Sequence, residues 1–450
     1  MRRIVLIALI LALSLSVFAI EDDVLSGDCK KLDFEGVLRA AIQNSYELKA
    51  TAINVERSKA RLSSAKRSYI PSLTLRATTE YMKGLDNRGD VAIVGDTIIN
   101  STTRFQDSIS LILQHRLMDW GILKNKVKIA KYDIEQKEVF EVQTLRDLKI
   151  KMLDLYTETL AIYLRYENLK EEKHLYEEIF KMQQRLHEAG LSSKLALSEA
   201  EINLNMVKTK IENLKLNFTE LLADLSFYVG TNYGDVENIS FSALELTSED
   251  VDSLNWEDSP EYIAYQKEIE KKKAELKIMK KEMLPQVSLY SGYSIYGTNK
   301  SNFATAISDM AQSNLSVGLT AGMPLLEPIK AAPRVKELEL EIQSLEIRQA
   351  QKIAEFQKDV NKTKQTLALY KSEAAKNLEF SRKLNEQLAD FEKLDSERLI
   401  SKIDLYMQKI KNNQQNTELE IMEQRAYAAG HKLRFLMEDR SEANQLVNNT

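Results

Sequence analysis

Hydrophobic and polar residues follow two different periods along this chain. In most of the sequence the apolar residues recur every three or four positions, which predicts helices. Four short stretches instead alternate apolar and small or polar residues one by one, which predicts β-strands with one apolar face. These stretches are residues 72–81, 108–114, 286–296 and 314–323. We therefore expect four strands inserted into a chain that is mainly helical.

The apolar face of these stretches is the first functional clue. Each stretch is about as long as a strand that crosses a bilayer at a tilt, and apolar–polar alternation is typical of a lipid-facing barrel. The residues that we expect to face lipid are Leu73, Leu75, Ile109, Leu111, Leu113, Val287, Leu289, Leu315, Val317 and Leu319. The alternation also fits two soluble hairpins packed on a helical core, and this alternative stays open at this point.

The chain is an internal duplication. Pro71 corresponds to Pro285 at an offset of 214 residues, and Leu197 corresponds to Leu405 at an offset of 208. The difference falls between the paired alternating stretches, where a loop tolerates a change of length. Each copy is predicted to contain a helix, a strand, a loop, a strand, a long helix, a turn and a helix.

The predicted helices are very long. Residues 122–189 contain no glycine or proline, and 68 residues of helix span about 100 Å. Residues 334–429 lack both residue types as well. The segments 33–69 and 192–228 are each about half as long, so two of them placed end to end match one long helix. We expect long helices that lie side by side as in coiled coils, with two short helices sharing one parallel track.

The N-terminus predicts export. Arg2 and Arg3 precede an apolar run at 4–18 that ends in the small residue Ala19, which is the pattern of a secretory signal peptide. The resulting division of the chain is a signal peptide at 1–19, repeat 1 at 20–228, a polar equatorial connector at 229–258, repeat 2 at 259–438 and a polar C-terminal tail at 439–450.

Composition and motifs indicate no chemistry. The net charge of -5 gives no electrostatic reason to expect nucleic-acid binding, and the single cysteine cannot form an intrachain disulfide. No phosphate-binding loop is present, and no two of the four histidines have zinc-protease spacing. We therefore expect no enzyme activity, no catalytic residue, no cofactor and no metal, so a partner would have to supply any energy for transport.

Four strands cannot form a closed barrel by themselves. Hydrocarbon tolerates no open sheet edge, and the smallest bacterial barrels have eight strands. A lipid-facing sheet in this chain must therefore be shared between copies. Three copies would give twelve strands, and two copies, with eight, would also satisfy closure.

In the order, spacing and duplication of these features, the chain resembles the TolC-like outer-membrane efflux protein family. The resemblance covers nearly the whole mature chain and rests on the repeated strand-proline motif at Pro71 and Pro285, the strand-to-helix joints at 117–121 and 324–326, and the two helix-turn-helix tips. It implies a homotrimer in which an α-helical barrel through the periplasm continues a shared twelve-stranded β-barrel in outer-membrane lipid. It also implies docking to a periplasmic adaptor (membrane fusion protein) and an inner-membrane transporter.

The resemblance also implies contact sites at the tips. The adaptor-contacting residues would be Gly190, Leu191 and Ser192 in the first copy and Leu399, Ile400 and Ser401 in the second. Gly190 would reverse the chain with a positive φ, and Ser192 would cap the returning helix. The second copy departs from the pattern because Arg398 replaces this glycine.

Asp404 falls where the family places a pore-constricting aspartate, and Met407 occupies the second acidic position of that gate. A ring of aspartates on a three-fold axis would favour cations. The implied function is an outer-membrane channel-tunnel, a passive and porin-like exit duct for efflux or type I secretion. The alternative is a periplasmic coiled-coil scaffold or tether without a pore.

Overall fold

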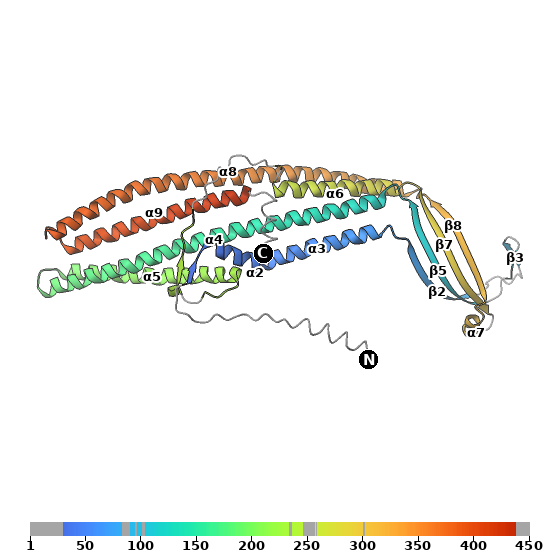
Figure 1. Cartoon of the computed structure of the whole chain (residues 1–450), viewed down its shortest axis with the longest axis horizontal. Coiled ribbons are helices and arrows are strands. Elements are labelled where there is room, and N and C mark those ends of the chain that lie inside the picture. Colours follow the sequence, from blue (N-terminus) through green and yellow to red (C-terminus); the bar gives the residue numbers. More distant parts are fainter. Residues whose placement is uncertain are drawn as a thin grey trace.

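The chain folds into long helices at one end and a β-sheet at the other (Figure 1). The structure, a computed structural model, describes residues 30–82, 91–94, 97–100, 104–233, 236–245, 257, 259–299 and 302–437. The predicted signal peptide and polar tail lie outside the described residues. The expected fold class, mainly helical with four principal strands in one chain, is confirmed.

The helices of the first half are α2 (Phe34–Asn44), α3 (Tyr46–Arg67), α4 (Ile122–Glu188) and α5 (Lys194–Val229). Helices α3 and α5 both pack along α4, so they occupy one track beside it, one after the other. Because α4 has 67 residues, it is about 100 Å long. The two shorter helices together match that length.

The segment 33–69 is two helices, whereas the sequence pattern indicated one. Ser45 separates them with an extended backbone (φ -60°, ψ 112°), and its hydroxyl accepts a hydrogen bond from the amide of Leu48 at 3.2 Å. Asp33 caps α2 in the same way, accepting from the amide of Gly36 at 2.9 Å. Serine and aspartate favour such N-cap positions because their side chains satisfy amides that have no helical partner.

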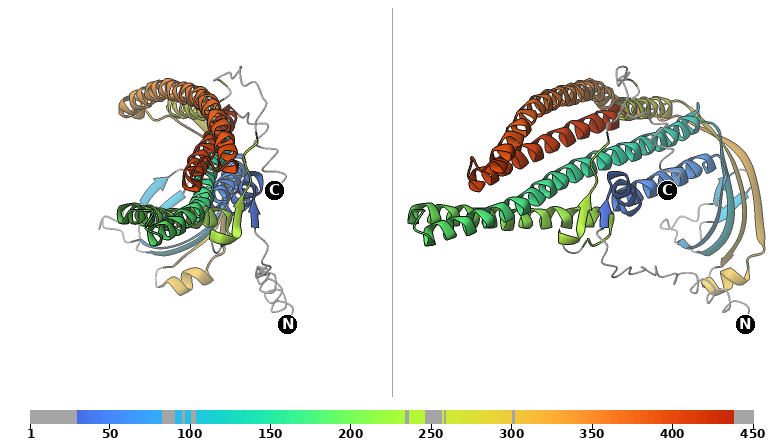
Figure 2. Two further views of the ribbon diagram at one scale, coloured as in Figure 1. Left: turned by 90° about the vertical axis from the view of Figure 1, so that its left-hand side faces the viewer. Right: turned by 60° about the vertical axis from the view of Figure 1, so that its left-hand side comes forward.

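The second half repeats this arrangement with α6 (Pro260–Glu282), α8 (Glu327–Ser396) and α9 (Lys402–Met437). Helices α6 and α9 each pack against α8 on one side and α4 on the other. The helical part is therefore a curved wall of four tracks in the order α3 and α5, then α4, then α6 and α9, then α8 (Figure 2).

The main sheet contains β2 (Ser72–Met82), β5 (Arg104–Met118), β7 (Gln286–Asn299) and β8 (Gln312–Gly322). Its strands are antiparallel in the order β2-β5-β7-β8, which is the order of the helical tracks to which they connect. Strands β2 and β8 have a free edge among the described residues. Smaller elements near the strand ends are the hairpin of β3 (Val91–Val94) and β4 (Thr97–Asn100), and α7 (Phe303–Ser308).

The largest apolar core lies beside the middle of α4. There β1 (Lys30–Leu32) pairs in parallel with β6 (Ile239–Phe241), which follows the short 3-10 helix η1 (Val236–Asn238). Tyr156 is fully buried, packs edge-on against the rings of Phe34 and Phe241, and donates a hydrogen bond to the carbonyl of Ser242 at 2.7 Å. This core holds β1, which precedes the helices of the first half, and β6, which follows them, against α4.

Candidate functional site

The register of the sheet brings the expected lipid-facing residues onto one face. Directly paired residues of antiparallel strands share a face. Leu75 pairs with Leu111, which pairs with Tyr293, which pairs with Leu315. The neighbouring rows on this face join Leu73 to Leu113 and Val317, Ile109 to Ile295, and Leu289 to Leu319, and Val287 lies beyond them opposite Ala321. All ten residues named from the sequence therefore lie on the same side, although their contact with lipid stays a prediction.

The opposite face of the sheet is polar. One of its rows joins Arg76, Ser110, Ser294 and Asn314, and the hydroxyls of Ser110 and Ser294 are 2.9 Å apart. Side chains of this kind solvate well, so the sheet has one face suited to hydrocarbon and one suited to water. This is the two-sided pattern of a strand in a membrane barrel with an aqueous interior.

The apolar face ends before the loops. Near that end Asp107 is 1% exposed and accepts a hydrogen bond from the hydroxyl of Thr79 at 2.6 Å. The short helix α7 packs over the same face, where the rings of Phe105 and Phe303 are 4.5 Å apart and a side chain at Gly297 would collide with α7. The exposed apolar band is therefore limited to the part of the sheet between α7 and the helices.

The joint between sheet and helices is held by a constrained turn. Trp120 has a φ of 54°, and Gly121 follows with a φ of 81°. The indole nitrogen of Trp120 donates to the carbonyl of Pro285 at 2.6 Å, and the carboxylate of Asp119 accepts from the amides of Gly121 and Leu123. The turn that starts α4 is thus tied directly to the equivalent strand-proline motif of the second half.

The first tip has the expected glycine turn. Gly190 has a φ of 71°, and the amide of Leu191 donates to the carbonyl of Leu186 at 2.8 Å, as in a glycine-terminated helix. The side chain of Leu191 is 77% exposed. The expected cap was wrong by one position: Ser193 caps α5 by accepting from the amide of Ala196, while the hydroxyl of Ser192 donates to Gln183.

The second tip has the same turn without glycine. Arg398 has a φ of 61°, and the amide of Leu399 donates to the carbonyl of Leu394 at 2.9 Å. Leu399 is 65% exposed, and the hydroxyl of Ser401 accepts from the amide of Ile403 at 3.2 Å. The departure at Arg398 therefore leaves the backbone hydrogen bonds of the turn unchanged.

The proposed gate position lies just beyond this second turn. Asp404 is exposed in the first turn of α9, and Met407 is 44% exposed one turn later. Ile403, Tyr406 and Ile410 of the same helix pack instead with the tip region of α4 and α5. The helix therefore leaves Asp404 and Met407 uncovered within one chain, and their place in a pore stays a prediction.

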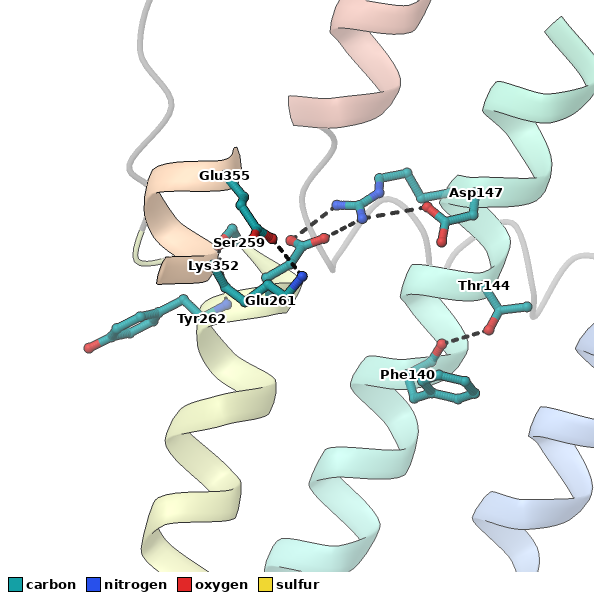
Figure 3. A network of polar contacts seen from close by, with 9 residues as sticks. Phe140, Thr144, Asp147, Ser259, Glu261, Tyr262, Lys352 and Glu355 are labelled. Atoms are coloured by element: carbon teal, nitrogen blue, oxygen red, sulfur yellow. Dashed lines mark hydrogen bonds and ion pairs between the residues drawn. The ribbon is translucent and has the colours of Figure 1, made fainter. Parts of the chain in front are cut away.

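Polar contacts join the two halves along α4. Arg146 of α4 makes a bidentate ion pair with Glu261 at the start of α6 (Figure 3). A carboxylate oxygen of Asp147 lies 3.6 Å from the same guanidinium group. Burial would lower the pKa of Arg146, but the bond and charge of Glu261 outweigh this effect and raise it. A groove of about 560 Å³ runs beside this pair. The sequence analysis missed this pair, since no local pattern links positions 146 and 261.

A second polar contact joins α4 and α9 nearer the tips. Glu172 is 2% exposed and accepts hydrogen bonds from the amides of Asn168 at 2.7 Å and Gln414 at 3.0 Å. Burial raises the pKa of Glu172, while Gln414, Asn168 and the charge of Lys210 oppose the increase. The seam between the two hairpins thus contains a carboxylate that is costly to keep ionised.

The described residues contain no group of three or more histidine, cysteine, aspartate or glutamate side chains arranged to hold a metal. Among the same residues, no helix is both long enough and apolar enough to span a bilayer.

Comparison with known proteins agrees with this architecture. Residues 37–231 match the model of the Outer membrane efflux protein family. A search of the curated proteins gave no match. Among solved structures, the chain is similar to CusC (14% identity, covering 90% of this chain and 92% of that one, TM-score 0.74). It is also similar to the outer membrane protein VceC from Vibrio cholerae (14%, 90% and 96%, 0.73) and to the CmeC outer membrane channel from Campylobacter jejuni (13%, 92% and 88%, 0.74).

The chain therefore has the fold of the solved outer-membrane channels named above, and its residues 37–231 match the Outer membrane efflux protein family. The resemblance to TolC-like outer-membrane efflux proteins is confirmed, over residues 37–231 by the family model and over the described chain by the fold. A scaffold without a pore is not favoured.

Proposed function

We propose that three copies of this chain form a passive exit duct, with a twelve-stranded barrel in the outer membrane and a helical tunnel in the periplasm. The observation that carries the proposal is the four-stranded sheet with one apolar face and two edges that no other described strand pairs with. Such edges are untenable in hydrocarbon unless another copy pairs with them. Three copies supply twelve strands and twelve helical tracks.

The outer tracks of the helical wall support the same assembly. Ile53 of α3 is 69% exposed and Leu216 of α5 is 66% exposed, while on the opposite edge Ile347 and Leu369 of α8 are 71% and 63% exposed. Apolar side chains at both edges of a wall are stabilised when they are buried against another copy. The sheet edges at β2 and β8 thus continue into the helical edges at α3 and α8, and both pairs of edges would be covered by a neighbouring copy.

In this proposal, the helical tips of the duct bind its periplasmic partner. Leu191 and Leu399 at the tips are exposed apolar side chains suited to a periplasmic adaptor, which would join the duct to an inner-membrane transporter. The transporter supplies the energy and selects the cargo, whether a small molecule or a secreted protein. Asp404 acts as a gate residue where the three copies of α9 converge. The division into signal peptide, two repeats and connector belongs to the same proposal.

The test is conductance in a planar lipid bilayer. Purified oligomer should produce stepwise, long-lived current increments, and the same preparation after heat dissociation serves as the control. A scaffold without a pore would give no increments and would fractionate without detergent. Absence of conductance from a well-folded oligomer would overturn the proposed function.

A further inference from the structure

Cations gather on four helices at the sheet end of the helical wall. We name it the basic collar; it consists of Lys66, Arg67, Lys124, Lys126, Lys128, Lys131, Lys277, Lys281, Arg334 and Lys336, at the end of α3, the start of α4, the end of α6 and the start of α8. All but the half-buried Lys281 are exposed. None of them has an ion pair with a described residue, although neighbours such as Lys280 and Lys330 do. The collar is therefore a patch in which cations without ion pairs outnumber the carboxylates interspersed among them, such as Glu282, Glu327 and Glu337, in a chain whose net charge is -5.

The fold gathers charges that the sequence separates. A Cβ atom placed on Gly121 would lie 3.5 Å from the ammonium nitrogen of Lys281 and 3.9 Å from the Cβ of Lys124. Lys124, Lys128 and Lys131 lie four and three residues apart, so they share one face of α4. Like charges on one helix face repel each other, and a bound anion would relieve that repulsion further than the single carboxylate of Asp119 at this turn does.

The location of the collar indicates which anion. Along the molecule, the apolar sheet face gives way to exposed apolar and aromatic side chains at the joint, namely Leu117, Met118, Trp120, Leu325 and Leu326. The collar follows on the helices directly beyond them (Figure 1). Hydrocarbon, interface and headgroup would be met in this order by a protein that leaves a bilayer, and aromatic residues favour the interface.

We propose that the basic collar binds the anionic headgroups of glycerophospholipids in the leaflet on the helical side of the bilayer. The proposal rests on the proposed function, because it takes the sheet to lie in a membrane. Basic residues near an anionic membrane surface each strengthen binding by about fivefold, and the attraction is screened by salt. The collar would set the depth and tilt at which the duct leaves the membrane.

The test compares lipids retained by the purified oligomer. The protein is incubated in detergent with equal amounts of phosphatidylglycerol and phosphatidylcholine, and the lipids that remain bound are counted by native mass spectrometry at low and high salt. Wild type should retain phosphatidylglycerol preferentially at low salt. The variant K124Q/K128Q/K131Q should reduce that preference by about tenfold or more. The control K358Q/K362Q/K364Q removes three exposed lysines without ion pairs to described residues, about 50 Å along α8 from its start, and should leave the preference intact.

Several outcomes separate this inference from the proposed function. Equal retention of both lipids by wild type, or equal loss in both variants, overturns the lipid site while normal bilayer conductance leaves the duct standing. If the α4 variant instead changes the ion selectivity of the current and leaves lipid preference unchanged, the collar lines the water path and the inference is wrong. Failure of wild type to conduct in any lipid counts against the duct itself.

Discussion

The two tips offer a matched experiment on backbone strain. Gly190 and Arg398 occupy equivalent turns with φ values of 71° and 61°, and each turn is closed by a hydrogen bond of 2.8 or 2.9 Å from the next residue's amide. A residue other than glycine in this left-handed region costs about 1–2 kcal/mol. A Cβ added at Gly190 meets nothing within 4 Å, so only the backbone conformation changes.

The expected effects therefore have opposite signs. Gly190→Ala should destabilise the first tip by about 1 kcal/mol, and Arg398→Gly should stabilise the second by a similar or smaller amount, since glycine also gains freedom in the open state. A change of about 1 kcal/mol alters a local opening equilibrium roughly fivefold. The amide of Leu191 should then exchange its hydrogen about five times faster in the first variant, and the amide of Leu399 should exchange more slowly in the second.

The assay is hydrogen exchange followed by mass spectrometry on peptides that cover each tip. Amides of the core around Tyr156 provide an internal reference, because the tips lie far from that core along the helices (Figure 1). Gly430→Ala is the control variant, since Gly430 also has free space around it but a helical backbone. Unchanged exchange in both tip variants, or a change of the same sign in both, would refute the reasoning.

Three further predictions concern seams and gate. Glu261→Gln should lower the free energy of unfolding by about 3 kcal/mol, because it leaves the largely buried Arg146 without its main counter-charge. Asp147→Asn changes a side chain that is 71% exposed and should cost less than about 1 kcal/mol. Thermal unfolding in detergent measures both variants, and equal costs would contradict Glu261 as the main partner of Arg146. Asp404→Ala should increase the resting current in bilayers, and an unchanged leak would remove Asp404 from the gate. Because burial raises the pKa of Glu172, the folded protein binds its proton more tightly, so stability falls as pH rises from about 4.3 through the higher folded pKa. Glu172→Gln should make the free energy of unfolding less dependent on pH in this window. An unaltered slope would contradict the raised pKa of Glu172.

Local periodicity was enough to predict much of the fold. The alternation around Leu75 and Leu315 identified strands and also their common face, because a period of two leaves only one set of residues on each side. The absence of glycine and proline between 122 and 189 identified α4 nearly to its end. Equal lengths of the shorter segments indicated that they share a track, which is how α3 and α5 lie along α4.

Other features were beyond the reach of local patterns. Serine is compatible with helix interiors and caps alike, so neither the break at Ser45 nor the cap at Ser193 could be located to the residue. The left-handed turn at Arg398 depends on closure of the α8–α9 hairpin, which overrides the residue's own preference. The pairing of Arg146 with Glu261 joins positions 115 residues apart. The lysines at the start of α4 are visible in the sequence, but their position next to the apolar sheet face and to Lys281 of α6 is set by the fold.

The most direct test of the whole account is whether β2 of one copy pairs with β8 of the next. In a variant with Cys29 replaced by serine, Thr74 on β2 is changed to cysteine together with Asn314, Ser316 or Gly318 on β8, one at a time, and the protein is oxidised in its membrane. The two strands lie at opposite edges of a single chain's sheet, so a disulfide between them requires two chains. We expect at least one pair to give a covalent ladder that ends at three chains on a non-reducing gel. Monomers with every pair, or a ladder that ends at two or passes three, would contradict the shared twelve-stranded wall.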